Sequence, residues 1–325
     1  MPANLSPEYH RAEDRLRTSK TPDEKIAALE EMLRVIPKHK GTDHMQADLK
    51  GRIAKLRKEA GKPATKGGFS YIIPREGAGQ VALVGPPNAG KSSLVCALTH
   101  AKPAVGQYPF TTREPGPGMM AFEDVAFQLV DLPPLSAQHA EPWVFDLVRY
   151  ADLLWFVIDG EHELEGYDDT LRVLQTHNIG VYPSGTKPSF EHATVQKEAI
   201  LVVTGIDNPA VRDSLPVLRE LLDRPWTVVG ASSVTGENLD ILRRATFDAF
   251  GIVRIYTKQP GKPPDLHKPY TLPRGGTIAD LAARIHHDLA VGMTHARVWG
   301  MGVFDGQSVD KQHVLADKDV VEIHE

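Results

Sequence analysis

The sequence lacks the features of a secreted or membrane protein. Its 325 residues contain one cysteine, Cys96, which excludes an internal disulfide framework. The first 17 residues are polar and do not resemble a signal peptide. The longest apolar run, Ala151 to Ile158, is too short to cross a bilayer and is typical of a buried strand. We therefore expect a cytoplasmic protein that does not enter the membrane.

A net charge of -5 conceals a basic segment near the N-terminus. Residues 38–66 contain nine Lys or Arg against three acidic residues. This excess predicts either a surface for an acidic partner or an ordinary solvated helix face, and the sequence leaves both open.

Hydrophobic periodicity predicts three regions. A helix is expected from Thr21, where a hydroxyl N-cap precedes Pro22, and a second from about Asp43 to Glu59. Short apolar runs then alternate with helix-length segments, which predicts an α/β fold with a doubly wound, mainly parallel sheet. The expected strands and domains are these: strands at 81–84, 126–130, 153–158, 200–203 and 227–229; a basic helical region at 1–65, the α/β domain at 66–250 and a small α+β domain at 251–325.

One motif indicates phosphate binding. The segment after the first expected strand fits G-x-x-x-x-G-K-[ST], the P-loop, and reads Gly85-Pro86-Pro87-Asn88-Ala89-Gly90-Lys91-Ser92. In such a loop, backbone N-H groups bind phosphate oxygens, Lys91 approaches the β- and γ-phosphates, and the Ser92 hydroxyl can ligate Mg²⁺. We expect the phosphates to be held by Asn88, Ala89, Gly90, Lys91, Ser92 and Ser93.

The base is indicated by two downstream segments. Thr204-Gly205-Ile206-Asp207 lies in the register of the [NT]-K-x-D motif, and a carboxylate at Asp207 can accept from N1-H and the 2-amino group of guanine. A later segment, beginning Ser232-Ser233, is similar to the S-A-x-x-G-x-N-L motif that contacts guanine O6. We therefore expect a guanine site formed by Thr204, Asp207, Ser232 and Ser233; an ATP-using P-loop protein is disfavoured by Asp207.

These motifs, with Tyr108-Pro109-Phe110-Thr111-Thr112 and the C-terminal segments, resemble the Obg-like GTPases, in particular the developmentally regulated GTP-binding (DRG) family. The resemblance implies a C-terminal TGS domain of ubiquitin-like β-grasp fold and a slow GTPase that uses Mg²⁺. Thr112 is implied as a catalytic residue beside Lys91, and the metal ligands are implied to be Ser92, Thr112 and Asp131. It also implies that RNA or the ribosome is bound through the N-terminal helices and the TGS domain.

Several residues depart from that family. Pro134 replaces the glycine of D-x-P-G and has no N-H to offer a γ-phosphate, and Gly205 replaces the lysine of N-K-x-D. Leu135 stands where Ras-type enzymes have the water-orienting glutamine. The small domain that DRG proteins insert in the GTPase core is absent. A binding module with little or no hydrolysis therefore stays an alternative to a slow GTPase.

Two minor assignments remain. Asn88 matches a P-loop asparagine that some Obg proteins use with bound K⁺, and it is equally suited to be a turn residue. Cys96, on the helix after the P-loop, is expected in the core.

Overall fold

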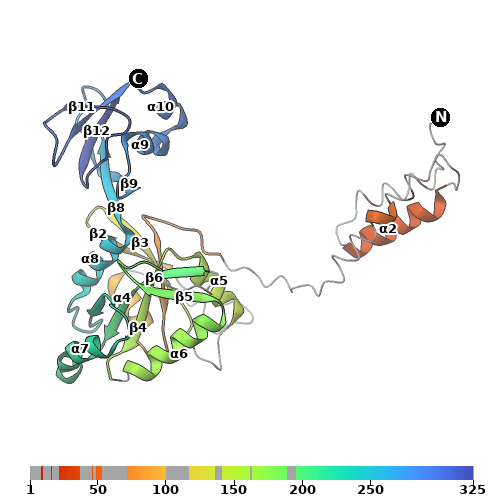
Figure 1. Cartoon of the computed structure of the whole chain (residues 1–325), viewed down its shortest axis with the longest axis horizontal. Helices are drawn as coiled ribbons and strands as arrows, with labels where there is room; N and C mark the ends of the chain where they lie inside the picture. The colour runs from red at the N-terminus through yellow and green to blue at the C-terminus, as the bar shows by residue number, and fades with distance from the viewer. Residues whose placement is uncertain are drawn as a thin grey trace. The chain divides into compact units, whose positions relative to one another are not determined.

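The chain forms two compact units, residues 1–70 and 71–325. This computed structural model describes residues 9, 16, 22–36, 46, 49–52, 72–99, 117–135, 141–161, 163–188 and 195–324. Figure 1 traces the whole chain, with labels on most of its elements. Within those residues, no helix is long and apolar enough to cross a membrane.

The first unit contains the expected N-terminal helix. Helix α2 spans Pro22–Val35 and begins at the proline that the sequence places at its first position. Only residues 46 and 49–52 of the second expected helix lie among the described residues, and all of them are helical. The unit has a small apolar core, formed by Tyr9, Leu29, Met32, Ile36 and Leu49.

The second unit opens with a seven-stranded sheet that confirms the α/β prediction. The strand order is β2-β3-β1-β4-β6-β5, and β7 pairs with the C-terminal half of β6. Every pairing is parallel except β2 with β3, which form an antiparallel hairpin. The strands are β1 (Gln80–Val84), β2 (Pro117–Phe122), β3 (Val125–Asp131), β4 (Leu153–Asp159), β5 (Ile179–Pro183), β6 (Val195–Thr204) and β7 (Val228–Gly230).

Both faces of this sheet are covered, as a doubly wound fold requires. Along β4, Leu154 and Phe156 enter one apolar cluster, while Trp155 and Val157 enter the other. The first cluster includes residues of α5, α6 and α7, and the second includes residues of α4 and α8. The helices are α4 (Lys91–Leu98), α5 (Pro142–Tyr150), α6 (Glu163–Thr176), α7 (Pro209–Leu221) and α8 (Leu239–Phe250).

The structure differs from the sequence predictions at three places. Strands β2 and β5 were not expected, because their sequences, PGMMAF and IGVYP, are short and contain glycine and proline. Cys96 is exposed, so its expected place in the core is wrong. Helix α4 turns Leu94, Val95 and Leu98 to the sheet, which leaves Cys96 on its outer face.

The C-terminal part forms a second, five-stranded sheet with the order β11-β10-β12-β8-β9. Helix α9 begins with a capping box between Thr277 and Asp280 and packs Ile278 and Leu281 into this domain's core. His286 adopts an extended backbone conformation, so α9 ends there and α10 follows separately. This sheet and helix confirm the β-grasp prediction. The elements are β8 (Ile252–Thr257), β9 (Asp265–Pro273), α9 (Ile278–Ile285), α10 (His287–Gly292), β10 (His295–Trp299), β11 (Gln307–Val309) and β12 (Asp319–His324).

Candidate nucleotide site

The loop between β1 and α4 has the backbone of an anion site. A side chain at Gly85 would place its Cβ 2.0 Å from the carbonyl oxygen of Val157, so only glycine fits there. Asn88 and Gly90 both have left-handed backbones, with φ of 60° and 83°. Asn88 therefore serves as a turn residue, and its role toward K⁺ stays a prediction. Helix α4 starts at Lys91, so its N-terminal end faces the loop, as in phosphate-binding sites.

Lys91 is held inside this loop. Its side chain is 6% exposed, and its Nζ donates to the carbonyl oxygens of Gly85 at 3.0 Å and Pro86 at 2.7 Å. Burial lowers the pKa of Lys91 to about 8, and the charge of Asp131 opposes this shift. The ammonium therefore loses solvation in the loop, and a bound phosphate would restore favourable interactions to its charged form.

We expect nucleotide affinity to fall as the pH rises above the lowered pKa of Lys91. A bound phosphate raises that pKa, so binding above pH 8 requires the uptake of a proton. GDP affinity should drop about tenfold between about pH 7 and pH 9. Titration calorimetry across that range measures the drop.

The Lys91→Arg variant is the matched control, because arginine keeps its charge throughout this range. The GDP affinity of this variant should change with pH only through the titration of the guanine base of GDP, which affects both proteins equally. An equal fall in both proteins would show that Lys91 does not titrate in the loop.

A metal site is indicated where α4 meets the end of β3. The Ser92 hydroxyl donates to Asp131 Oδ2 at 2.6 Å. Asp131 Oδ1 is buried and accepts no hydrogen bond from the described residues. A hydroxyl and a carboxylate are oxygen ligands suited to Mg²⁺, so these two residues fit that ion. Thr112, the third expected ligand, lies outside the described residues.

The two expected base-binding segments come together. Asp207 follows β6, and the Ser232 hydroxyl, beyond β7, donates to its Oδ1 at 2.7 Å. Ser232 Oγ in turn accepts from the backbone amides of Val234 and Thr235, both at 3.2 Å. The hydrogen bond from Ser232 holds one carboxylate oxygen of Asp207 in place, and Asp207 itself is exposed to solvent. Ser233 is adjacent and half-buried, and the hydrogen bond to Asp207 comes from Ser232.

Thr204 connects the phosphate and base regions. It is buried, and its hydroxyl donates to the carbonyl of Ala89 at 3.0 Å, across 115 residues of sequence. Thr204 therefore links β6 to the P-loop. A second link, which no sequence motif indicated, is made by Arg212, which donates to Ile206 O at 3.1 Å and to Glu237 Oε2 at 2.6 Å. These contacts join the two base-binding loops.

The departures from the family pattern have visible consequences. Leu135 is fully buried in the core beside the sheet, and its amide donates to Gly85 O at 3.0 Å. Its side chain therefore cannot hold a water molecule at the phosphates. Gly205 has φ of 79°, a conformation that disfavours lysine even though the nearest atom to an added Cβ, Asp159 Oδ1, is 3.8 Å away. The backbone thus accounts for the glycine.

Comparison with known proteins agrees with this geometry. Residues 80–183 match the family described as 50S ribosome-binding GTPase, and residues 253–325 match the TGS domain. The chain is a GTP-binding protein with a P-loop GTPase domain. It belongs to the Obg-type GTPases that carry a C-terminal TGS domain, and it is similar to DRG proteins over most of its length.

Three known proteins illustrate the similarity. Developmentally-regulated G-protein 1 of Arabidopsis thaliana is 27% identical, covering 92% of this chain and 90% of its own. Ribosome-interacting GTPase 1 of Saccharomyces cerevisiae is 28% identical, covering 92% of this chain and 98% of its own, across 361 aligned positions. Because that alignment is longer than this chain of 325 residues, the yeast protein has segments with no counterpart here. The YchF GTPase of Schizosaccharomyces pombe shares the fold, with a TM-score of 0.52 over 77% of this chain and 99% of its own, at 14% identity.

Proposed function

We propose that this protein is a cytoplasmic, Mg²⁺-dependent GTPase switch with slow turnover that acts on RNA or the ribosome. The observation that carries the proposal is the Thr204 contact to Ala89, which joins the P-loop to the strand that ends at Asp207. Through it, a phosphate-binding loop and a guanine-type carboxylate belong to one rigid site. In this proposal Lys91 and the P-loop amides bind the phosphates, and Asp207 pairs with the base.

The proposed metal would be held by Ser92 and, through water, by Asp131, with Thr112 as the third ligand. Bound Mg²⁺ neutralises charge on the β- and γ-phosphates. The hydrogen bond between Ser92 and Asp131 keeps both oxygens at the phosphate end of the sheet. We propose K⁺ as a further cofactor through Asn88.

The ribosome or RNA is proposed as the partner because of the proteins to which the chain is similar and because of its basic N-terminal segment. A yeast relative is named a ribosome-interacting GTPase, and the matched family is described by ribosome binding. The basic segment at residues 38–66 has the charge that a phosphate backbone attracts, and its described members Lys50 and Arg52 are exposed. The TGS domain would supply the second contact.

A second candidate is a nucleotide-binding module with little or no hydrolysis. The buried Leu135 and the N-H lost at Pro134 favour it, because both remove groups that act on the γ-phosphate or the attacking water. Such a protein would exchange GDP and GTP without a chemical step.

Competition binding and ribosome sedimentation test the main proposal. GTP should displace GDP and ATP should not, and the protein should sediment with ribosomes differently with GDP and with a non-hydrolysable GTP analogue. Turnover in K⁺ and in Na⁺, with and without ribosomes, separates the switch from the binding module. Equal displacement by ATP would refute guanine binding, and no turnover under any condition would support the module.

We expect Pro134→Gly to favour GTP over GDP. The substitution supplies an N-H for the γ-phosphate, and a hydrogen bond to a charged group contributes about 1.5 to 3 kcal/mol. The added backbone freedom of glycine costs about 1 kcal/mol, so the net gain is smaller. Calorimetry with GDP and a GTP analogue measures the ratio of the two affinities.

Two further variants separate the donor from flexibility. Pro134→Ala adds the same N-H with less backbone freedom and should give at least the same gain, whereas Pro133→Ala adds a donor one residue away and should give none. A ratio unchanged in both Pro134 variants would show that this backbone position does not contact the γ-phosphate.

A further inference from the structure

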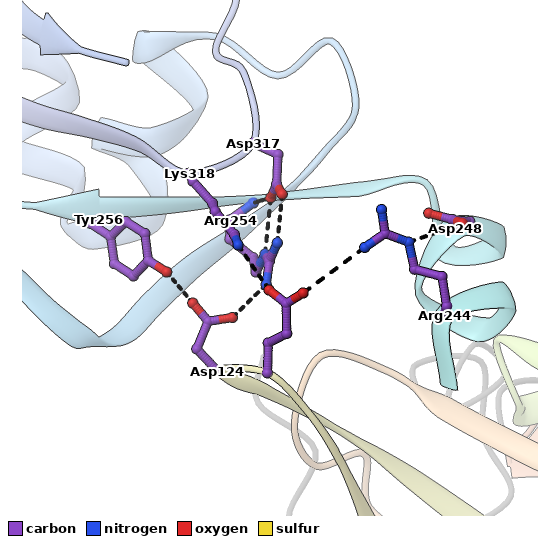
Figure 2. A network of polar contacts seen from close by, with 8 residues as sticks. Asp124, Arg244, Asp248, Arg254, Tyr256, Asp317 and Lys318 are labelled. Carbon is purple, nitrogen blue, oxygen red and sulfur yellow. Dashed lines mark hydrogen bonds and ion pairs between the residues drawn. The ribbon is translucent and has the colours of Figure 1, made fainter. Parts of the chain in front are cut away.

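A buried arginine joins the TGS domain to the GTPase domain. Arg254 lies on β8 and is 1% exposed. Its Nε and Nη2 donate to Asp317 of the same domain at 3.0 and 2.6 Å. Its Nη1 crosses to the turn of the β2–β3 hairpin and donates to Glu123 at 2.6 Å and to Asp124 at 2.7 Å (Figure 2). The guanidinium of Arg254 therefore donates hydrogen bonds to carboxylates of both domains.

Neighbouring groups complete this contact, which we call the Arg254 clamp and which comprises Arg254, Glu123, Asp124, Asp317, Tyr256 and Lys318. The Tyr256 hydroxyl donates to Asp124, and Lys318 Nζ lies 2.9 Å from Glu123 (Figure 2). Hydrogen bonds from Arg254 and Lys318 lower the pKa of Glu123. Burial, followed by the hydrogen bond to Asp124, raises the pKa of Tyr256 to about 12. The Glu123 carboxylate is therefore held charged, and the phenol of Tyr256 is held neutral, at neutral pH.

The covalent connection between the two domains is short. Helix α8 ends at Phe250, Gly251 has a left-handed backbone, and β8 begins at Ile252. The guanidinium of Arg254 also lies 4.7 Å from the ring centre of Phe247 on α8. With a junction of one residue, the TGS domain can turn against the GTPase domain only about Gly251, and only if the clamp opens.

The hairpin held by the clamp reaches the nucleotide site at its other end. Strand β3 runs from the hairpin turn to Asp131, whose carboxylate accepts from Ser92 of the P-loop helix. It is paired to β2 along its length, from Phe122 with Val125 to Pro117 with Val130. A seven-residue strand spans about 20 Å. The hairpin therefore connects the proposed metal ligand to the TGS contact as one paired element.

We propose that the β2–β3 hairpin transmits the nucleotide state of the GTPase domain to the orientation of the TGS domain, and that the Arg254 clamp is the contact through which it does so. This proposal rests on the proposed function for its nucleotide part. Coupling of this kind is reciprocal, so a broken clamp must also change the relative affinity for GDP and GTP.

Distance measurements between spin labels test the proposal in the full chain. In a Cys96→Ser background, labels at exposed positions of each domain, Gln175→Cys on α6 and Ser308→Cys on β11, report the domain orientation. Without nucleotide, the parent should give one narrow distance distribution. The distribution measured with a GTP analogue should be shifted relative to the one measured with GDP. Arg254→Met should broaden the distribution and abolish the shift.

Arg244→Met is the matched control. Arg244 is an exposed arginine 3.9 Å from Glu123, on the rim of the clamp, and its loss should keep the narrow distribution and the shift. If Arg254→Met does not fold, Asp124→Asn and Tyr256→Phe each weaken part of the same contact, and they should reduce the shift.

The outcomes separate the two proposals. If the distance distribution stays narrow in Arg254→Met, the clamp is overturned. If that variant does not fold, an unchanged shift in Asp124→Asn and Tyr256→Phe would overturn it instead. A parent that binds GDP and the GTP analogue with one unchanged distribution would overturn the coupling while the proposed function stands. Failure of either nucleotide to bind would overturn the proposed function and the coupling together, while the nucleotide-free distributions still report the clamp.

Discussion

Replacing Lys91 by alanine is expected to weaken GDP binding at least about a hundredfold. The ammonium is the buried cation of the P-loop, and in the proposed site its contacts to the β-phosphate of GDP are charge-assisted hydrogen bonds of about 1.5 to 3 kcal/mol each. The fold should survive, because the hydrogen bonds of Lys91 to described residues go to loop carbonyls, and one of these, Gly85 O, keeps the amide of Leu135 as a donor. Titration calorimetry measures the affinity, and thermal unfolding checks the fold.

Lys262→Ala controls for the loss of one positive charge. Lys262 is exposed in the TGS domain and contacts only Gln259, so GDP affinity should not change. A Lys91→Ala protein that binds GDP as tightly as the parent would mean that the loop is a structural turn. It would also remove the basis for the pH dependence expected above.

Replacing Asp207 by asparagine is expected to exchange guanine for xanthine nucleotides. In the proposed site, the Asp207 carboxylate of the parent accepts from N1-H and the 2-amino group of guanine. Asparagine offers one acceptor and one donor, so it repels the 2-amino group but matches the 2-oxo group of xanthine. GDP affinity should fall about a hundredfold or more, from two charge-assisted hydrogen bonds, and xanthosine diphosphate should bind more tightly than GDP.

Asp213→Asn is the matched control for this exchange. Asp213 is an exposed aspartate on α7, six positions after Asp207, and its replacement should leave base selectivity unchanged. The asparagine at 207 can still accept the hydrogen bond from Ser232, so the loop should keep its conformation. Retained preference for GDP over xanthosine diphosphate in Asp207→Asn would place the base elsewhere.

The central strands and the site loops could be predicted because their signals are local. Strands β1 and β4 and the C-terminal half of β6 contain continuous apolar runs, as strands buried on both faces must. The P-loop lies between a strand and a helix, and each residue of that motif depends on its neighbours in sequence. The approach of Asp207 to Ser232 followed from motif order alone.

The rest depends on contacts between distant residues. Strand β2 has two buried residues, Gly118 and Met120, and only Met120 has an apolar side chain, so its sequence does not show that it completes the sheet. Cys96 was misplaced because a small apolar residue can occupy either face of a helix. The Arg254 clamp joins residues 130 and 131 positions apart, and no local pattern distinguishes Arg254 from an ordinary strand residue.

The Arg254 clamp also has a consequence for evolution. Glu123 and Asp124 belong to the GTPase domain in sequence, yet their charges are balanced by cations of the TGS domain. A lineage that lost its TGS domain would leave two adjacent carboxylates at the hairpin turn with only the more distant Arg244 near Glu123. Selection for acidic residues there would end with the loss of the second domain. We therefore expect positions 123, 124 and 254 to change together in related chains, although a domain boundary separates them.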